Sequence, residues 1–180
     1  FGSARVEGSN RGIDARNYGT GALSITADDV YALNGAGIYA YANTDSTGVS
    51  VTVNEQAFSA NDAGIYARNR AYGDTYINAT NAAGNTYAAG TDYGIYAYGG
   101  FDTDALTIYA DIVSSFANDG VHARHDGSGD LTINVTNAAG TGLANGNGRG
   151  IYARNDGTAG LSITVNNATG FNSDGIYANN

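Results

Sequence analysis

The four-residue phrase Gly-Ile-Tyr-Ala occurs at residues 37–40, 64–67, 94–97, 150–153 and 175–178. Two variants complete the series, Gly12-Ile13-Asp14-Ala15 and Gly120-Val121-His122-Ala123. Successive phrase glycines are 25, 27, 30, 26, 30 and 25 residues apart. A phrase that returns at such intervals indicates a stacked repeat array, in which each repeat contacts its neighbours. We therefore expect coils that start near Gly12, Gly37, Gly64, Gly94, Gly120, Gly150 and Gly175.

A second apolar alternation follows each of the first six phrases, variants included. It begins 11 or 12 residues after the phrase glycine, as in Leu131-Thr132-Ile133-Asn134-Val135. Strict alternation of apolar and polar residues predicts a half-buried β-strand, and Ile, Val and Thr suit such a surface. The six copies start at Leu23, Val49, Thr75, Leu106, Leu131 and Leu161.

A third, weaker element follows the second alternation, and its position varies. We place it by its large apolar residues, which are Leu33, Phe58, Tyr87, Phe116, Leu143 and Phe171. Two repeats carry a shared insert before it, Asn81-Ala82-Ala83-Gly84 and Asn137-Ala138-Ala139-Gly140. Extra residues at one corner are what a stacked array tolerates, so we expect both inserts to protrude from the same edge.

Two or three short strands in every 25–30 residues predict an all-β parallel β-helix of about six to seven coils. At a strand spacing of about 4.8 Å, seven coils make a rod about 30–35 Å long. The phrase isoleucines and the central residues of the second strands would form stacked core rows. We expect residues 1–180 to be a single segment of a longer array.

The composition limits the possible partners. The chain has 27 Gly, no Pro, Cys, Met or Trp, and a net charge of −9. Nucleic acids and anionic lipids require a basic patch, so we expect no nucleic-acid partner. No run approaches the roughly 18 apolar residues that a membrane-spanning helix needs, so we expect no direct membrane insertion of this segment.

The complete repeat form is Gly-Ile-Tyr-Ala-Arg-Asn-x-Gly-x-x-x-Leu-x-Ile-x-Val, as in residues 150–165. It resembles the passenger regions of bacterial autotransporters, the type V secreted proteins, over residues 12–180. This resemblance implies a right-handed parallel β-helix. It also implies a secreted or cell-surface location, with anchoring at the outer membrane through a segment not present here. Many members of the family act as adhesins or self-associate, and some carry an enzyme as a separate domain.

Two surface ladders follow from the phrase if its Ile and Ala point inward. The first contains Asp14, Tyr39, Tyr66, Tyr96, His122, Tyr152 and Tyr177. The second contains Arg16, Tyr41, Arg68, Tyr98, Arg124, Arg154 and Asn179. Tyrosine and arginine favour contact with a glycan or a protein. Equally, stacked rungs can simply stabilise the sheet, and the two interpretations are compatible.

Catalytic, metal and cofactor sites are not predicted. The only histidines are His122 and His125, and His122 occupies a tyrosine position in the first ladder. Asp28-Asp29 and Asn43-Thr44-Asp45 are similar to acid motifs of β-helical polysaccharide hydrolases, but the chain has no Lys and lacks their basic motifs. Its 15 Asp could bind calcium, yet the nine-residue repeat of calcium-binding β-rolls is absent.

The sequence therefore predicts a structural, non-enzymatic rod at the cell surface that mediates adhesion or self-association. Its expected partners are protein or glycan surfaces and other copies joined end to end. The alternative is a polysaccharide-binding or polysaccharide-cleaving β-helix of the lyase or tailspike type. A cleft lined by clustered Asp with Arg would favour the alternative, and flat continuous ladders would favour the rod. Residues 175–180 carry no charge or proline, so we expect this end to be uncapped.

Overall fold

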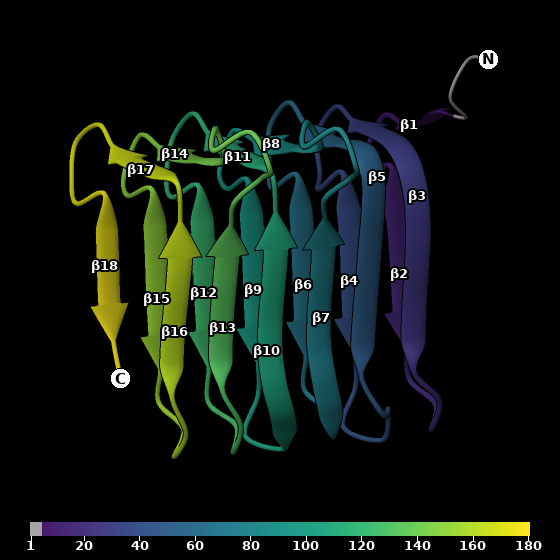
Figure 1. Ribbon diagram of the computed structural model, residues 1–180. Helices are drawn as coiled ribbons and strands as arrows, with labels where there is room; N and C mark the ends of the chain where they lie inside the picture. Colours follow the sequence, from purple (N-terminus) through teal and green to yellow (C-terminus); the bar gives the residue numbers. More distant parts are fainter. Residues whose placement is uncertain (1–4) are drawn as a thin grey trace.

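The fold is known from a computed structural model, which describes residues 5–180. Every regular element in this range is a β-strand. The strands pair in parallel and form two sheets, one of 11 strands and one of seven. Each strand pairs with its equivalent one coil away, so the chain is the β-solenoid that the repeats predict (Figure 1).

The seven-stranded sheet, called face A below, takes one strand from each phrase. Its strands are β2 (Ile13–Asn17), β4 (Ile38–Ala42), β6 (Ile65–Asn69), β9 (Ile95–Gly99), β12 (Val121–His125), β15 (Ile151–Asn155) and β18 (Ile176–Asn179). The phrase isoleucines pair directly: Ile13 with Ile38, and Ile38 with Ile65. The predicted parallel register of the phrase strands is confirmed.

The 11-stranded sheet covers two sides of the coil. Face B contains the first halves of β3 (Leu23–Ala32) and β5 (Val49–Ser59), with β7 (Gly73–Ala79), β10 (Thr103–Ala110), β13 (Leu131–Val135) and β16 (Leu161–Val165). Face C contains β1 (Arg5–Gly8), the second halves of β3 and β5, β8 (Tyr87–Gly90), β11 (Ile112–Ser115), β14 (Leu143–Gly146) and β17 (Asn167–Gly170). The long strands β3 and β5 turn from face B to face C at a register shift between Ala27 and Asp29.

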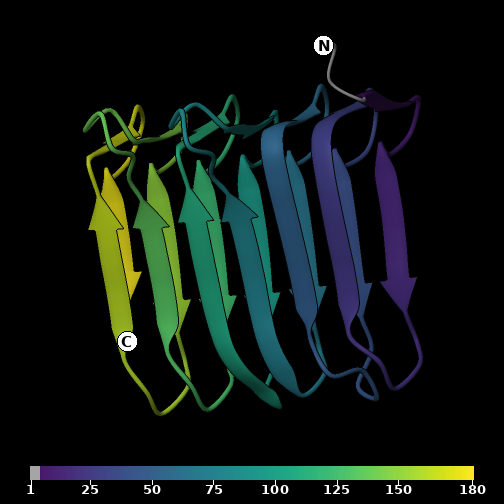
Figure 2. The same cartoon turned by 45° about the vertical axis from the view of Figure 1, so that its right-hand side comes forward.

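The coil winds to the right. In Figure 1 the strands of face B run upward in front, and those of face A run downward behind. Between them the chain crosses the top through face C and advances from β2 on the right to β18 on the left. Figure 2 shows the same arrangement after a turn of 45°. This is the handedness expected of parallel strands joined by crossovers.

Three buried rows form the core. Face A contributes the Ile or Val and the Ala of the five inner phrases, and face B contributes Val51, Ile77, Ile108 and Ile133, all fully buried. Face C contributes Val30, Ala57, Ala88, Val113 and Ala144, which are also fully buried. Burying one large aliphatic side chain contributes about 1.5–3 kcal/mol. Faces A and B therefore supply most of the apolar stabilisation.

The predicted third element is present as face C, but the large residues that mark it in the sequence do not line the core. Leu33, Phe116 and Phe171 follow the face C strands and are 47%, 64% and 70% exposed. Tyr87 and Leu143 lie at the half-buried first position of β8 and β14. The inward position of face C holds Val or Ala, which give little contrast with the surrounding Ala-rich sequence.

Each phrase begins with glycine because backbones of neighbouring coils pass too close for a side chain. At Gly64, a Cβ would lie 2.6 Å from the backbone nitrogen and oxygen of Ala89 and 2.7 Å from the carbonyl oxygen of Ala57. Gly64 does not have a positive φ. The requirement is therefore for space, not for a left-handed backbone.

Replacing a phrase glycine should destabilise the coil. We expect Gly64→Ala to lower the free energy of unfolding by about 1–3 kcal/mol, because the added methyl overpacks the contact with Ala89. Gly21→Ala is the matched control, since no atom lies within 4 Å of a Cβ there. Urea unfolding followed by circular dichroism measures both, and equal stabilities would contradict the packing argument.

The two inserts lie along one edge, as predicted. They join β7 to β8 and β13 to β14, and the Asn137 Nδ2 atom donates a hydrogen bond of 2.8 Å to the carbonyl oxygen of Gly84. A side chain of the following coil closes each insert, because it accepts hydrogen bonds from backbone nitrogens at both ends of the insert. Asp111 Oδ2 accepts from the backbone nitrogens of Asn81 at 3.0 Å and Thr86 at 3.1 Å.

Asn166 closes the second insert in the same way. Its Oδ1 atom accepts from the backbone nitrogens of Asn137 at 3.1 Å and Gly142 at 3.2 Å. A short corner that carries Asp or Asn therefore satisfies the backbone donors at both ends of the insert one coil before it.

Shortening an insert should leave the strands intact. We expect deletion of residues 82–84 to preserve the far-UV circular dichroism spectrum, because the insert lies outside the three core rows. Asp111→Ala should instead lower the free energy of unfolding by about 1–3 kcal/mol, because it leaves the buried backbone nitrogen of Thr86 and the half-buried one of Asn81 without a partner. Cooperative loss of the whole fold on deletion would show that the insert belongs to the core.

Candidate functional site

The first predicted ladder is a continuous stack of six rings on the outside of face A. It contains Tyr39, Tyr66, Tyr96, His122, Tyr152 and Tyr177. Neighbouring ring centres are 4.4–5.3 Å apart, and their planes differ by 6–13°. The separation follows the strand spacing of about 4.8 Å, since each ring projects from the same register position.

Arginines and acids surround this stack. The Arg11 guanidinium lies 4.0 Å from the ring centre of Tyr39, and Arg149 lies 5.3 Å from Tyr152 and 5.0 Å from Tyr177. Arg11 also pairs with Asp14 at 2.6 Å. Guanidinium groups over ring faces add cation–π attraction to the stack.

Stacking of the ladder rings on one another limits which parts of each ring a ligand can contact. Each inner ring has both faces covered by its neighbours, so the edges and hydroxyl groups face solvent. Cross-strand aromatic pairs contribute about 0.2–1 kcal/mol each. The geometry thus supports the stabilising interpretation, and a binding role for this ladder stays a prediction.

The second ladder is a network of paired charges. Arg124 contacts Asp126 at 2.9 Å and Asp156 at 3.3 Å, and Arg154 contacts Asp156 at 2.7 Å. The hydrogen bond from Arg154 holds the pKa of Asp156 below its ordinary value. Arg68 instead lies over the Tyr98 ring at 5.4 Å. Arg16, the first arginine of this ladder, pairs with Asp14 at 2.9 Å.

His122 is held in the stack by an acid. Its Nδ1 atom lies 2.9 Å from Asp119 Oδ2, and Asp119 Oδ1 accepts from the backbone nitrogen of Arg149 at 2.9 Å. Burial raises the pKa of Asp119, but these two hydrogen bonds outweigh it and leave the pKa below its ordinary value. Residues 5–180 contain no group of three or more His, Cys, Asp or Glu able to hold a metal ion.

His125 is a titratable side chain inside the core. It lies in a row with Asn69 and Asn155, whose side chains hydrogen-bond the corner that joins face A to face B. His125 is fully buried, and neither ring nitrogen has a well-aligned hydrogen bond within the described residues, although the backbone of Gly129 and Asp104 lies near the ring. It fits because Gly99 precedes it in the row, where a Cβ would lie 2.6 Å from its Nδ1 atom. In the sequence, His125 stands at the same distance from its phrase glycine as Asn69 and Asn155 do, and this shared position is the pattern that marks it as a row member.

Burial lowers the pKa of His125 below 6.5, against the opposing effect of the Gly129 and Asp104 backbone and of nearby acids. As the pH falls below about 6.5, the folded protein therefore takes up less proton at His125 than the unfolded chain does. Stability should be unaffected above about pH 6.5 and should fall as the pH drops below it, towards the lowered pKa of the folded state.

We expect His125→Asn to remove this component of the pH dependence. The control is His122→Tyr, which restores the ladder residue and leaves His125 in place. Unfolding curves between pH 7.5 and about 5 measure the difference. An identical pH dependence in both variants would exclude His125 as its source.

The acid motifs singled out in the sequence are not brought together. Asp28 and Asp29 lie in β3 where it turns towards face C, whereas Asp45 lies in the corner between β4 and β5, at the other end of face B. A hollow of about 330 Å³ contains Asp29 and Glu55 with Gln56, Asn81, Asn85 and Tyr87. Arg5 is near Asp29, at 3.5 Å.

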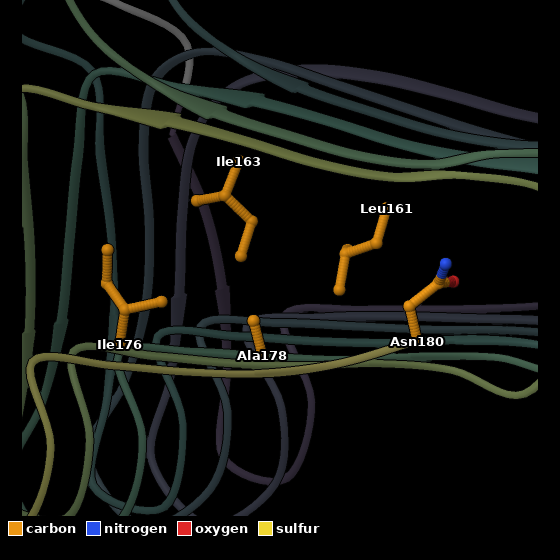
Figure 3. Close-up of a pocket in the computed structure, with 5 residues that line it drawn as sticks. All are labelled: Leu161, Ile163, Ile176, Ala178 and Asn180. Carbon is orange, nitrogen blue, oxygen red and sulfur yellow. The ribbon is translucent and has the colours of Figure 1, made fainter.

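Two further hollows lie at a corner and at one end of the rod. The corner hollow is lined by Thr44, Arg70, Tyr98, Gly100, Phe101 and Asp102, with a volume of about 340 Å³. The end hollow is lined by Leu161, Ile163, Ile176, Ala178 and Asn180 (Figure 3). There the side chains of β16 and β18 face one another across the uncovered core.

Comparison with known proteins adds no family. No protein-family model matches the chain, and searches of curated proteins and of solved structures return no match. Within residues 5–180 there is also no helix with the length and apolar character needed to cross a membrane.

Proposed function

We propose that this chain is a segment of a non-enzymatic surface rod that mediates adhesion and self-association, of the kind found in autotransporter passenger regions. The observation that carries the proposal is the continuous in-register solenoid, whose face A presents two flat ladders of side chains along the rod. Within the described residues, the last coil leaves the apolar rows open (Figure 3). Ile176 is 43% exposed, whereas its neighbour in the same row, Ile151, is fully buried.

The strands of the last coil can pair with a further coil of the same repeat. The strands β16, β17 and β18 each have one neighbour, so each presents an unpaired edge beside the apolar row. Unpaired edges are templates for further strands. A coil of the same repeat would pair with all three edges and bury Leu161, Ile163 and Ile176. Such a coil could come from the same chain or from a second copy.

The sides of the rod support contact without catalysis. Face A presents two flat ladders, and its charges are largely paired. Glycoside hydrolysis needs two carboxyl groups about 5–9.5 Å apart on either side of the scissile bond. The two acid motifs lie at opposite ends of face B, which weakens the case for the polysaccharide-cleaving alternative.

Self-association can be tested at the open end. We expect the protein to associate in a concentration-dependent way in analytical ultracentrifugation. Salt should promote association by screening the repulsion from a net charge of −9. Ile163→Asp should weaken the association constant by about tenfold or more, since it places a charge in the apolar row.

Thr164→Asp is the matched control, because it adds the same charge on the exposed side of the same strand. It should associate as the unmodified chain does, apart from the small effect of one added charge. A stable monomer at high protein and salt concentration would refute self-association through this end.

A further inference from the structure

The corner between β9 and β10, at the lower edge of the rod in Figure 1, carries an exposed ring beside a polar hollow. Phe101 is 81% exposed, and it borders a hollow shared with Arg70 and Asp102. The hollow volume of about 340 Å³ lies within the range of about 300–1,000 Å³ typical of small-molecule sites.

Phe101 is held on a well-fixed turn. The backbone nitrogen of Thr103 donates to the carbonyl oxygen of Gly100 at 3.0 Å, which closes the turn around Phe101. The nitrogen of Gly100 donates to Asn69 at 2.9 Å, and the buried Thr103 hydroxyl donates to Ala71 at 3.2 Å. The ring is therefore presented by a corner that is bonded to the coil before it.

The faces of this ring are open. The ladder rings cover one another, whereas Phe101 contacts no other ring or guanidinium in the described part of the chain. Single exposed apolar residues are common on protein surfaces, so exposure alone indicates nothing. The charges in the hollow provide the second observation.

Arg70 differs from the other arginines. All eight arginines lie within the described residues, and seven pair with a carboxylate or lie over a ring: Arg5, Arg11, Arg16, Arg68, Arg124, Arg149 and Arg154. Arg70 does neither, and Asp102 has no side-chain hydrogen bond or ion pair to the described residues. Guanidinium donors and carboxylate acceptors are thus available in one hollow.

We propose that this corner binds a neutral glycan. A sugar ring has an apolar face, which would stack on Phe101, and an edge of hydroxyl groups. Those hydroxyls both donate and accept, so they match Asp102 and Arg70 together. The opposite charges of Arg70 and Asp102 cancel, and the overall charge of −9 disfavours an anionic glycan.

A glycan fits this corner better than a peptide. Extended peptides commonly bind by adding a strand to a free sheet edge. Here β9 is paired on both sides by β6 and β12, and β10 by β7 and β13, so no edge is free at the hollow. The proposal supplies a ligand class for the adhesive role proposed above and rests on it.

The test uses a panel of neutral oligosaccharides containing glucose, galactose, mannose or N-acetylglucosamine, added singly and followed by saturation-transfer NMR and calorimetry. We expect at least one to bind, with Phe101→Ala and Arg70→Met each weakening the affinity by about tenfold or more. The controls are Phe116→Ala, another exposed phenylalanine, and Arg5→Met, an ion-paired arginine outside both ladders. Both controls should bind as the unmodified chain does.

Several outcomes would overturn the glycan site. These are no binding across the panel, unchanged affinity in Phe101→Ala, or equal losses in Phe116→Ala. Binding of a peptide, and of no sugar, at Phe101 would assign the corner to a protein partner instead. Phe101→Ala should still associate end to end in the ultracentrifuge, so failure here is distinguishable from failure of the rod proposal.

Discussion

The stacking of the coils depends on the glycine that begins each phrase, because the neighbouring backbones leave no space for a side chain there. A Cβ at Gly37 would lie 2.6 Å from the carbonyl oxygen of Gly64, and one at Gly120 would lie 2.7 Å from that of Gly150. Most phrase glycines meet the next one in this way, and Gly64 meets the backbone of Ala89 instead. These contacts bring successive backbones together where face C passes into face A. Once these contacts are made, the isoleucines one residue later fall into register, and the core rows follow.

The same register creates the aromatic ladder. The tyrosine two residues after a phrase glycine stacks on its equivalent in the next coil, because in-register strands place the two rings side by side. His122 enters the stack without disturbing it, being planar and of similar reach. The stacking that stabilises face A also covers the ring faces. Recognition by an aromatic face therefore falls to rings outside the ladder, such as Phe101.

Sequence periodicity was sufficient for faces A and B, because alternating Ile, Tyr and Ala, or Leu, Thr and Ile, mark both sides of a strand. It marked face C only weakly, because the inward row there contains small residues such as Val113 and Ala144. The corner hollow escaped detection. Arg70 and Phe101 lie one coil apart, in segments that the sequence marks only as turns. Arg70 lacks an ion pair because of the residues that surround it in the fold, and a local sequence pattern does not show which residues these are.

The closed inserts have a consequence for how such a rod can vary in length. An insert is satisfied by a short corner carrying Asp or Asn in the following coil, as with Asp111 and Asn166. Two adjacent coils with inserts would leave the first one open. The inserts begin at Asn81 and Asn137, 56 residues or two coils apart. Duplication of one insert-bearing coil alone would place two inserts in adjacent coils, whereas its duplication together with the short-cornered coil that follows would keep every insert closed.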